Sequence, residues 1–600
     1  MAQKKKTIDF GFTPSEYQQK IFDFVTNGVG NAVISAMAGS GKTTSLVSAM
    51  KLIPSNQKCI FLAFNKSIAE ELANKLTDLT NVRVRTSHSL GYAFLMRNLG
   101  KTFELDEYKY NTYVKKNISE LSSVNDKIKT KADFNEYLAT ILTLVHFARF
   151  NYCQTVKEID QIALKYSIPI VYDECDVVLK VLKWGKENTA TVDYTDMVWL
   201  PVECNMNPKG MQYDWVFIDE AQDQSVISIE LFKKCFKRGT RFIAVGDPSQ
   251  QIYTWAGSSE YAFNKMCNLP NTKIFTLPIS YRCDKKIVES VHDLVPDIMA
   301  REDAGEGEVN ENCNTWLLKD GDMVLSRSKA PLMKLYTKLL KRNIRCYIKG
   351  QDIAKNLITL IENVDKEELS VDLKKNGLFP QLYLKLFNDR NKLMQTRGLD
   401  YDDATCASSV LTLYDNITTL SILAEKCKYK HELIKRIKTI FAEESDGICL
   451  STIHKAKGLE ADNVYILCRS TMPSKKAKLE WEIKQEENLI YVAYTRAKHK
   501  LGLLSEKECP PCGADQEASD IINELMYIEN KISKFLNFEP TVRMSHADIA
   551  KFNLKDVKEI PEEDVKKKNV VYKSINKEKK KLEEQIKELT KRLEELNKQV

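Results

Sequence analysis

The sequence predicts an α/β protein with two parallel-sheet domains, each carrying a helical insertion, and a C-terminal coiled-coil-like helix. Short apolar runs, typical of buried parallel strands, recur in two separate parts of the chain. Helical spacing instead dominates residues 95–190 and 352–445, which predicts the two insertions. In residues 571–600, apolar side chains recur mostly every three or four positions, as in a heptad seam.

The composition is that of a globular protein with several cores. Six hundred residues, 43% hydrophobic and 28% charged, are enough for several domains. No apolar run approaches ~18 residues, and the basic Met1–Lys6 lacks the apolar stretch of a secretory signal, so neither a membrane span nor secretion is expected. We expect an intracellular protein, in the cytoplasm or nucleus, with fifteen reduced cysteines. The net charge of +7 allows a nucleic-acid partner without requiring one.

Residues 33–45 predict a phosphate-binding loop between a strand and a helix. Gly39 and Gly41 allow successive backbone N–H groups to point at an anion, although Ala36 stands where the usual pattern has glycine. Lys42 can reach the β- and γ-phosphates, and the Thr43 hydroxyl can hold Mg²⁺. The expected nucleotide cradle is Ala38, Gly39, Ser40, Gly41, Lys42, Thr43 and Thr44.

Polar side chains follow several of the predicted strands of the first domain. Asn65 comes after the apolar run 59–64, and His88 follows a short strand at 82–84. Ligands bind at the carboxyl ends of strands in open α/β sheets, so these two side chains can line a track for a phosphate backbone. The pair Cys509 and Cys512 lacks a second pair, so it fits a turn better than a zinc site.

Adjacent carboxylates end the apolar run 215–218. Asp219 can hold Mg²⁺ through water, and Glu220 can activate an attacking water. After the next strand, Gln250 can sense the γ-phosphate. Tyr253 and Trp255 can offer faces to nucleobases, worth roughly 1–3 kcal/mol per stacked base, although buried core aromatics are the alternative.

Together these segments resemble the motifs of the UvrD/Rep branch of superfamily 1 DNA helicases, over about residues 10–508. The amino-acid sequences of residues 61–68 and 245–253 are most similar to those of the F-box DNA helicases, although no F-box is expected because little chain precedes Gln18. Segments 447–460 and 486–498 resemble the family's motifs V and VI. The resemblance implies an ATP- and Mg²⁺-dependent enzyme that moves 3′-to-5′ on single-stranded DNA and unwinds duplex at single-strand/duplex junctions.

The resemblance also implies two RecA-like P-loop domains. The first would comprise residues 1–94 and 191–290 with insertion 95–190, and the second residues 291–351 and 446–508 with insertion 352–445. Residues 509–570 would form a linker or tail before the helix at 571–600.

Individual roles follow from the same resemblance. Gln18 would read adenine, Tyr281 would stack on it, and Glu460 would touch the ribose. Arg282 and Arg496 would neutralise charge on the γ-phosphoryl group. The hydrolysis site would contain Lys42, Thr43, Asp219, Glu220 and Gln250, and the DNA contacts would be Asn65, His88, Tyr253, Trp255, Thr452 and His454.

Two positions depart from the family pattern. The aromatic residue of the family's motif Ia is displaced by one position, so Phe64 is expected to pack inward. Ala256 stands where many relatives have arginine, so a contact is expected to be missing there.

The C-terminal seam leaves three roles open. Its apolar positions are Ile575, Leu582, Ile586, Leu589, Leu593, Leu596 and Val600. A helix with fewer than four heptads is marginal alone, so it fits self-association, a partner protein or folding back onto the chain. For the whole chain, the alternatives to unwinding are a translocase that strips proteins from DNA and a coiled-coil scaffold switched by ATP. RNA is an alternative track, because phosphate contacts and stacking do not read the 2′-OH.

Overall fold

The computed structural model describes residues 10–100, 103–123, 131–166, 172–254, 260–370, 375–397, 399–441 and 446–536, with Ile168, Ile170 and Leu373. Trp255, Ala256 and the predicted helix at 571–600 lie outside the described residues. Within the described ranges, none of the helices combines the length and apolar character that a bilayer crossing requires.

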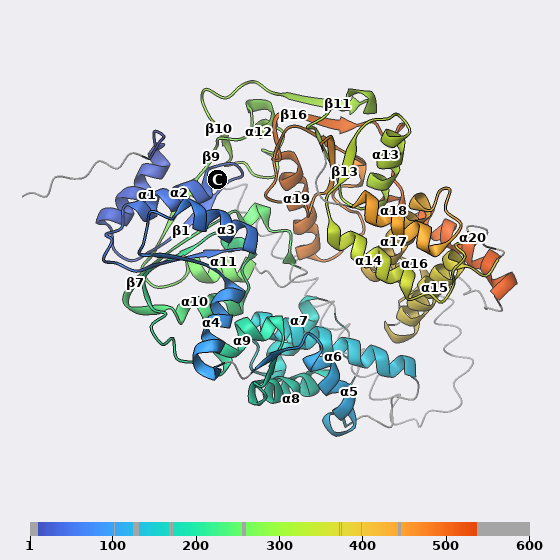
Figure 1. The fold of residues 1–600 in the computed structure, drawn as a ribbon, viewed down its shortest axis with the longest axis horizontal. Coiled ribbons are helices and arrows are strands. Elements are labelled where there is room, and N and C mark those ends of the chain that lie inside the picture. The colour runs from blue at the N-terminus through green and yellow to red at the C-terminus, as the bar shows by residue number, and fades with distance from the viewer. Residues whose placement is uncertain are drawn as a thin grey trace, which may run out of the picture.

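The first sheet has six parallel strands in the order β3-β2-β6-β7-β1-β8 (Figure 1). Its strands are β1 (Asn31–Ala36), β2 (Cys59–Ala63), β3 (Val82–Thr86), β6 (Tyr213–Ile218), β7 (Phe236–Gly246) and β8 (Thr272–Leu277). Strand β2 is buried along its whole length, which explains its uninterrupted apolar sequence.

Alternate residues of these strands face two separate cores. Ile60 and Leu62 join the core that includes α4 (Ser87–Leu99), α9 (Tyr194–Glu203), α10 (Val226–Lys233) and α11 (Glu260–Cys267). Phe61 and Ala63 join the core that includes α1 (Glu16–Asn27), α2 (Lys42–Lys51) and α3 (Lys66–Lys75). The first sheet is therefore covered by helices on both faces.

The segment between α4 and α9 is mostly helical, and we call it the first insertion. It contains α5 (Lys109–Leu121), α6 (Lys131–Asn151), α7 (Val156–Lys165) and α8 (Glu174–Glu187), and a two-stranded pairing of β4 (Glu104–Leu105) with β5 (Thr191–Val192). These helices form the blue-to-teal group at the bottom of Figure 1.

Buried charges join the first insertion to α9. The fully buried carboxylate of Asp196 on α9 accepts from Lys109 at 2.6 Å and from Arg149 at 2.9 Å. Helix α9 packs closely on α4, because a Cβ on Gly91 would lie 1.8 Å from Met197 O. The insertion is therefore anchored, through α9, to the helices of the first sheet.

The second sheet also has six parallel strands, in the order β11-β16-β15-β12-β14-β13. Its strands are β11 (Glu308–Cys313), β12 (Met323–Ser326), β13 (Cys346–Ile348), β14 (Ile448–Thr452), β15 (Ala461–Ile466) and β16 (Ala497–Leu504). Its helices are α12 (Lys285–Glu289), α13 (Ala330–Leu340) and α19 (Glu480–Tyr494). Between the two sheets, β9 (Ile279–Ser280) pairs with β10 (Met299–Ala300). We call the first and second sheets, each with its helices, the first and second lobes.

The second insertion differs from the prediction at its C-terminal side. It contains α14 (Gln351–Glu362), α15 (Leu378–Arg397), α16 (Tyr401–Thr405), α17 (Ser408–Leu423) and α18 (Lys430–Ile440). Helix α20 (Ala518–Leu536) packs against α15 and α16, although the sequence predicts a linker over 509–570 (Figure 1). Its apolar face, including Ile521, Leu525 and Ile528, completes this core, so the linker prediction is wrong for 518–536.

A buried ion pair attaches α20 and yields a prediction. Arg390 Nη2 lies 2.7 Å from Glu529 Oε1, and both side chains are almost fully buried. Glu529→Ala is expected to lower the free energy of unfolding by about 3 kcal/mol, because it leaves the buried guanidinium without its carboxylate. Denaturant unfolding measures this, with Glu517→Ala, from the exposed Lys475–Glu517 pair, as a control expected to cost less than about 1 kcal/mol. Equal effects would contradict a special role for the buried pair.

Candidate functional site

The loop between β1 and α2 has the shape of an anion cradle. Gly39 and Gly41 have φ angles of +72° and +75°, a region that favours glycine. A Cβ on Gly39 would also lie 2.6 Å from Arg282 Cβ, so the glycine lets the segment after β9 approach the loop. The Ser40 hydroxyl oxygen is buried and has no hydrogen-bond partner within the described part of the chain. These features fit a nucleotide phosphate at the N-terminus of α2.

The predicted magnesium and hydrolysis groups meet beside this loop. The Thr43 hydroxyl donates to Asp219 Oδ2 at 2.7 Å, and Lys42 Nζ lies 3.8 Å from Glu220 Oε2. A hydroxyl and a carboxylate oxygen are ligands that suit Mg²⁺. Glu220 has a φ of +47°, a strained conformation for glutamate that aims its side chain from the end of β6.

The two carboxylates have opposite electrostatic environments. Burial and the neighbouring Glu220 charge raise the pKa of Asp219 to about 6. Burial also opposes ionisation of Glu220, but Lys42, Lys457 and Arg496 outweigh it and lower the pKa to about 2. Gln222 donates to Glu220 Oε2 at 2.6 Å. Glu220 is therefore held ionised, as a base that receives a proton from water must be.

The predicted adenine reader lies beside the P-loop helix. Gln18 is buried in α1, and its Nε2 donates to Ser45 Oγ on α2 at 3.0 Å. Its Oε1 accepts from the Ser15 N–H at 3.0 Å, so the side chain also caps its own helix. Tyr281 is 40% exposed, and its N–H donates to Gly39 O at 2.9 Å. Both residues are thus next to the cradle.

Both predicted arginines are at the boundary between the two lobes. Arg282 binds Glu460 at 2.7 Å and donates to Thr495 O at 3.1 Å. Arg496 is buried and donates to Val492 O at 2.9 Å. Burial and the nearby Arg282 lower the pKa of Arg496 to about 10, while the charge of Glu220 opposes this. The arginines thus lie close enough to each other and to Glu220 for their charges to interact.

Tyr491 of α19 connects the second lobe to the P-loop, a contact that the sequence interpretation missed. Its hydroxyl accepts from the Ala38 N–H at 2.8 Å and donates to Asp247 Oδ2 at 3.1 Å. Asp247 also accepts from Gln250 Nε2 at 2.8 Å, so the predicted γ-phosphate sensor belongs to the same network. Tyr491 lies inside segment 486–498, but the sequence of a motif does not indicate which groups the Tyr491 hydroxyl contacts.

Tyr491→Phe is expected to destabilise the protein by about 1–3 kcal/mol, because the Ala38 N–H and Asp247 would each lose a buried partner. It should also raise the KM for ATP, since the loop loses its support. Thermal unfolding and steady-state hydrolysis measure the two effects. Tyr494→Phe, which removes a hydroxyl bound to Arg469 within the second lobe, is the control and should leave the KM unchanged. An unchanged KM in both variants would contradict the supporting role.

The predicted strand-facing residues lie on both lobes. Asn65 caps α3 by accepting from the Ile68 N–H at 2.9 Å, and His88 is exposed at the start of α4. On the second lobe, Thr452 ends β14, and burial lowers the pKa of His454 to about 4. Tyr253 of the first lobe joins the two sides, because its hydroxyl donates to His454 O at 2.9 Å.

The expectation that Phe64 packs inward is wrong. Its side chain is 37% exposed, and its ring stacks on Tyr253 with centroids 6.1 Å apart and planes 16° apart. The backbone turns outward after β2 to begin α3 at Lys66, and this brings the ring to the surface. Phe64 and Tyr253 thus form one aromatic step, the kind of surface on which bases stack.

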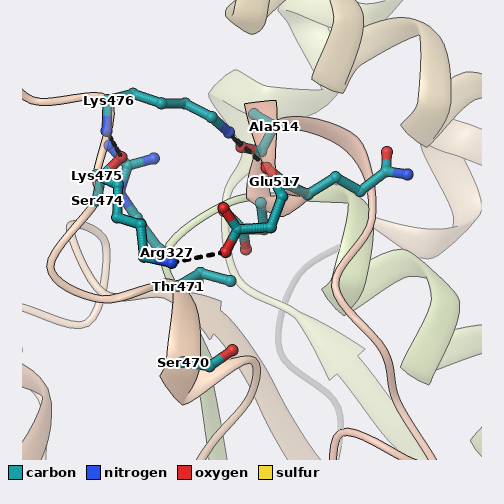
Figure 2. A pocket seen from close by; sticks show the side chains of 10 residues that line it. Arg327, Ser470, Thr471, Ser474, Lys475, Lys476, Ala514 and Glu517 are labelled. Carbon is teal, nitrogen blue, oxygen red and sulfur yellow. Dashed lines mark hydrogen bonds and ion pairs between the residues drawn. The ribbon is translucent and has the colours of Figure 1, made fainter. Parts of the chain in front are cut away.

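A small pocket is lined by Arg327 and by residues of the second lobe, and none of the predicted site residues is among its lining residues (Figure 2). It is bordered by the loop that carries Ser470, Ser474 and Lys476 and by residues around Asp515. Arg327 itself is paired with Glu486 at 2.7 Å. The volume of about 30 Å³ accommodates roughly one or two water molecules, so this pocket is too small for a nucleotide. No cluster of metal-ligating side chains is found among the described residues, including Cys509 and Cys512.

Comparison with known proteins identifies the family. The family model for the UvrD/REP helicase N-terminal domain matches residues 17–270, and that for the UvrD-like helicase C-terminal domain matches 447–504. The chain is 24% identical to a probable DNA helicase II homolog of Mycoplasma genitalium, over 80% of this chain and 83% of that protein. It is 22% identical to ATP-dependent DNA helicase PcrA of Bacillus subtilis, over 80% and 81% of the two chains.

A third relative is F-box DNA helicase 1 of Gallus gallus, 25% identical over 80% of this chain but only 48% of that protein. The two matched domains contain the P-loop, the paired carboxylates and Arg496 in the order that the sequence predicts. The chain belongs to the UvrD/Rep-like family of DNA helicases.

Proposed function

We propose that this chain is an ATP-dependent DNA helicase that moves along single-stranded DNA. The observation that carries the proposal is that side chains from both lobes meet at one nucleotide cradle. Lys42 and Glu220 come from the first lobe, and Tyr491 and Arg496 from the second. A nucleotide held by both lobes favours their closure, and its hydrolysis releases them.

The hydrolysis step uses the first-lobe groups. Lys42 and the backbone N–H groups of the loop bind the phosphates, while Thr43 and Asp219 would hold Mg²⁺, which neutralises phosphate charge. Glu220, ionised and fixed by Gln222, orients the attacking water and accepts its proton. Gln18, Tyr281 and Glu460 are proposed to bind the adenine and the ribose.

The two arginines would complete the site when the lobes close. Arg496 is buried at a cost in desolvation, which the negative charge of a γ-phosphoryl group would offset. Arg282 would exchange its ion pair with Glu460 for the same phosphoryl group. Closure would thus be coupled to charge neutralisation at the reacting atoms.

Movement on DNA would follow from strand contacts on both lobes. Asn65 and His88 lie on the first lobe, Thr452 and His454 on the second, and the Phe64–Tyr253 step lies between. Each closing and opening would advance the strand by about one nucleotide, in the 3′-to-5′ direction that the family resemblance suggests. Single-strand/duplex junctions would be the substrate for unwinding.

The test is ATP turnover with and without single-stranded DNA, followed by unwinding of duplexes with a 3′ or a 5′ overhang. We expect DNA to stimulate turnover about tenfold or more, and the 3′ overhang to support unwinding. Displacement of a pre-bound protein without unwinding would favour the protein-stripping alternative. Lack of stimulation by DNA would favour an ATP-switched scaffold. Equal stimulation by RNA would indicate that RNA also serves as a track.

A further inference from the structure

The ammonium group of Lys457 lies between the proposed strand interface and the hydrolysis site. Lys457 follows β14, and its Nζ donates to Asp223 Oδ2 at 2.5 Å and to Gln250 O at 2.7 Å. The same nitrogen is 5.1 Å from the centre of the Tyr253 ring. The Lys457 side chain is 9% exposed and that of Asp223 is fully buried, so water screens this contact little.

On the strand side, Lys457 shares a turn with His454. Tyr253 donates its hydroxyl proton to His454 O at 2.9 Å, which ties the aromatic ring to that turn. The Tyr253 ring also stacks on the exposed ring of Phe64. A base that stacks on the Phe64–Tyr253 step therefore presses on a ring that is attached to the turn carrying Lys457.

On the hydrolysis side, Lys457 contacts two elements of the first lobe. Asp223 lies three residues after Glu220, in the short helix η2 (Ala221–Asp223). Its ion pair with Lys457 therefore fixes the segment that directly follows Asp219 and Glu220. Gln250 O belongs to the residue whose side chain donates to Asp247. A shift of this ammonium group would therefore disturb both segments together.

We infer that Lys457 is the positioning residue through which a nucleobase on Tyr253 accelerates ATP hydrolysis. Lys457 acts through Asp223 and Gln250 and does not itself touch the reacting phosphate. The inference rests on the proposed function and adds to it a physical link between the DNA-binding site and the hydrolysis site. The two contacts of Lys457 hold the segment after Glu220 and the segment around Gln250 in a fixed position relative to the bound DNA strand.

The test compares Lys457→Gln with wild type for ATP turnover with and without an oligodeoxythymidine, and for oligonucleotide affinity by fluorescence anisotropy. We expect the stimulation factor to fall about tenfold or more, while the Kd for the oligonucleotide changes less than about threefold. Lys457→Arg keeps the charge and should retain part of the stimulation. Lys341→Gln, which breaks the exposed pair with Glu425, is the matched control and should behave as wild type.

A double variant separates positioning from folding. Lys457→Gln leaves the buried Asp223 carboxylate unpaired and should lower the Tm, whereas Lys457→Gln combined with Asp223→Asn removes both charges and should recover it. The inference predicts that stimulation stays low in the double variant. Recovery of stimulation together with the Tm, or normal stimulation of Lys457→Gln, would overturn it. Absence of stimulation in wild type would instead overturn the proposed function.

Discussion

Lys42→Ala is expected to reduce kcat for ATP hydrolysis by about 10³-fold. We propose that Lys42 is the cation that the P-loop presents to the β- and γ-phosphates, and removal of one preorganised group that stabilises transition-state charge costs about this much. A second cause adds to the first, because Lys42 is the main influence that lowers the pKa of Glu220. The variant is therefore expected to lose phosphate binding and also part of the electrostatic stabilisation of the ionised Glu220 carboxylate.

Steady-state phosphate release, measured at saturating single-stranded DNA, tests this prediction. The control is Lys51→Ala, since Lys51 lies at the last turn of the same helix, away from the loop. That variant is expected to retain wild-type turnover. Turnover of Lys42→Ala within tenfold of wild type would show that the P-loop assignment is wrong.

Arg496→Lys is expected to reduce kcat by about 10³-fold or more, the range that an arginine finger contributes. Lysine keeps the charge, but it cannot reproduce the planar set of donors by which Arg496 contacts Val492 O and Leu459 O. The head group would therefore sit differently beside Glu220. We expect the KM for ATP to change much less than kcat, because the contact matters mainly in the transition state.

Single-turnover hydrolysis with preformed complexes of enzyme, ATP and DNA separates this effect from slow product release. Arg301→Lys, from the exposed pair of Arg301 with Asp303, controls for a generic arginine replacement and should have no effect. A loss in Arg496→Lys that appears only as weaker ATP binding would contradict a transition-state role. A large fall in Tm would indicate that the side chain mainly supports the fold.

The strands that the sequence predicts most clearly are those that are buried. The runs 59–63 and 215–218 are apolar and 448–450 is apolar before Ser451 and Thr452, and the structure places all three in parallel sheets. The candidate site is predictable for a related reason. Thr43, Asp219 and Glu220 lie at strand or helix ends, where local order along the chain already fixes their placement.

Features that depend on contacts between distant segments could not be predicted from the sequence pattern. Helix α20 has a clear apolar face, but only its docking on α15 reveals that it belongs to the second insertion. Phe64 follows a fully buried strand, so its exposure depends on where the next helix begins. Tyr491 and Lys457 lie in recognisable segments, yet their partners are more than 200 residues away.

The buried ions between the first insertion and α9 have a mechanical consequence. Asp196 is clamped by Lys109 and Arg149, and Gly91 brings α9 into direct contact with α4. Breaking such buried pairs is costly, so the insertion is expected to behave as a stiff lever and not as a tethered arm. A force applied to the first insertion would then be transmitted through α9 to the first sheet, with little bending where the insertion contacts α9.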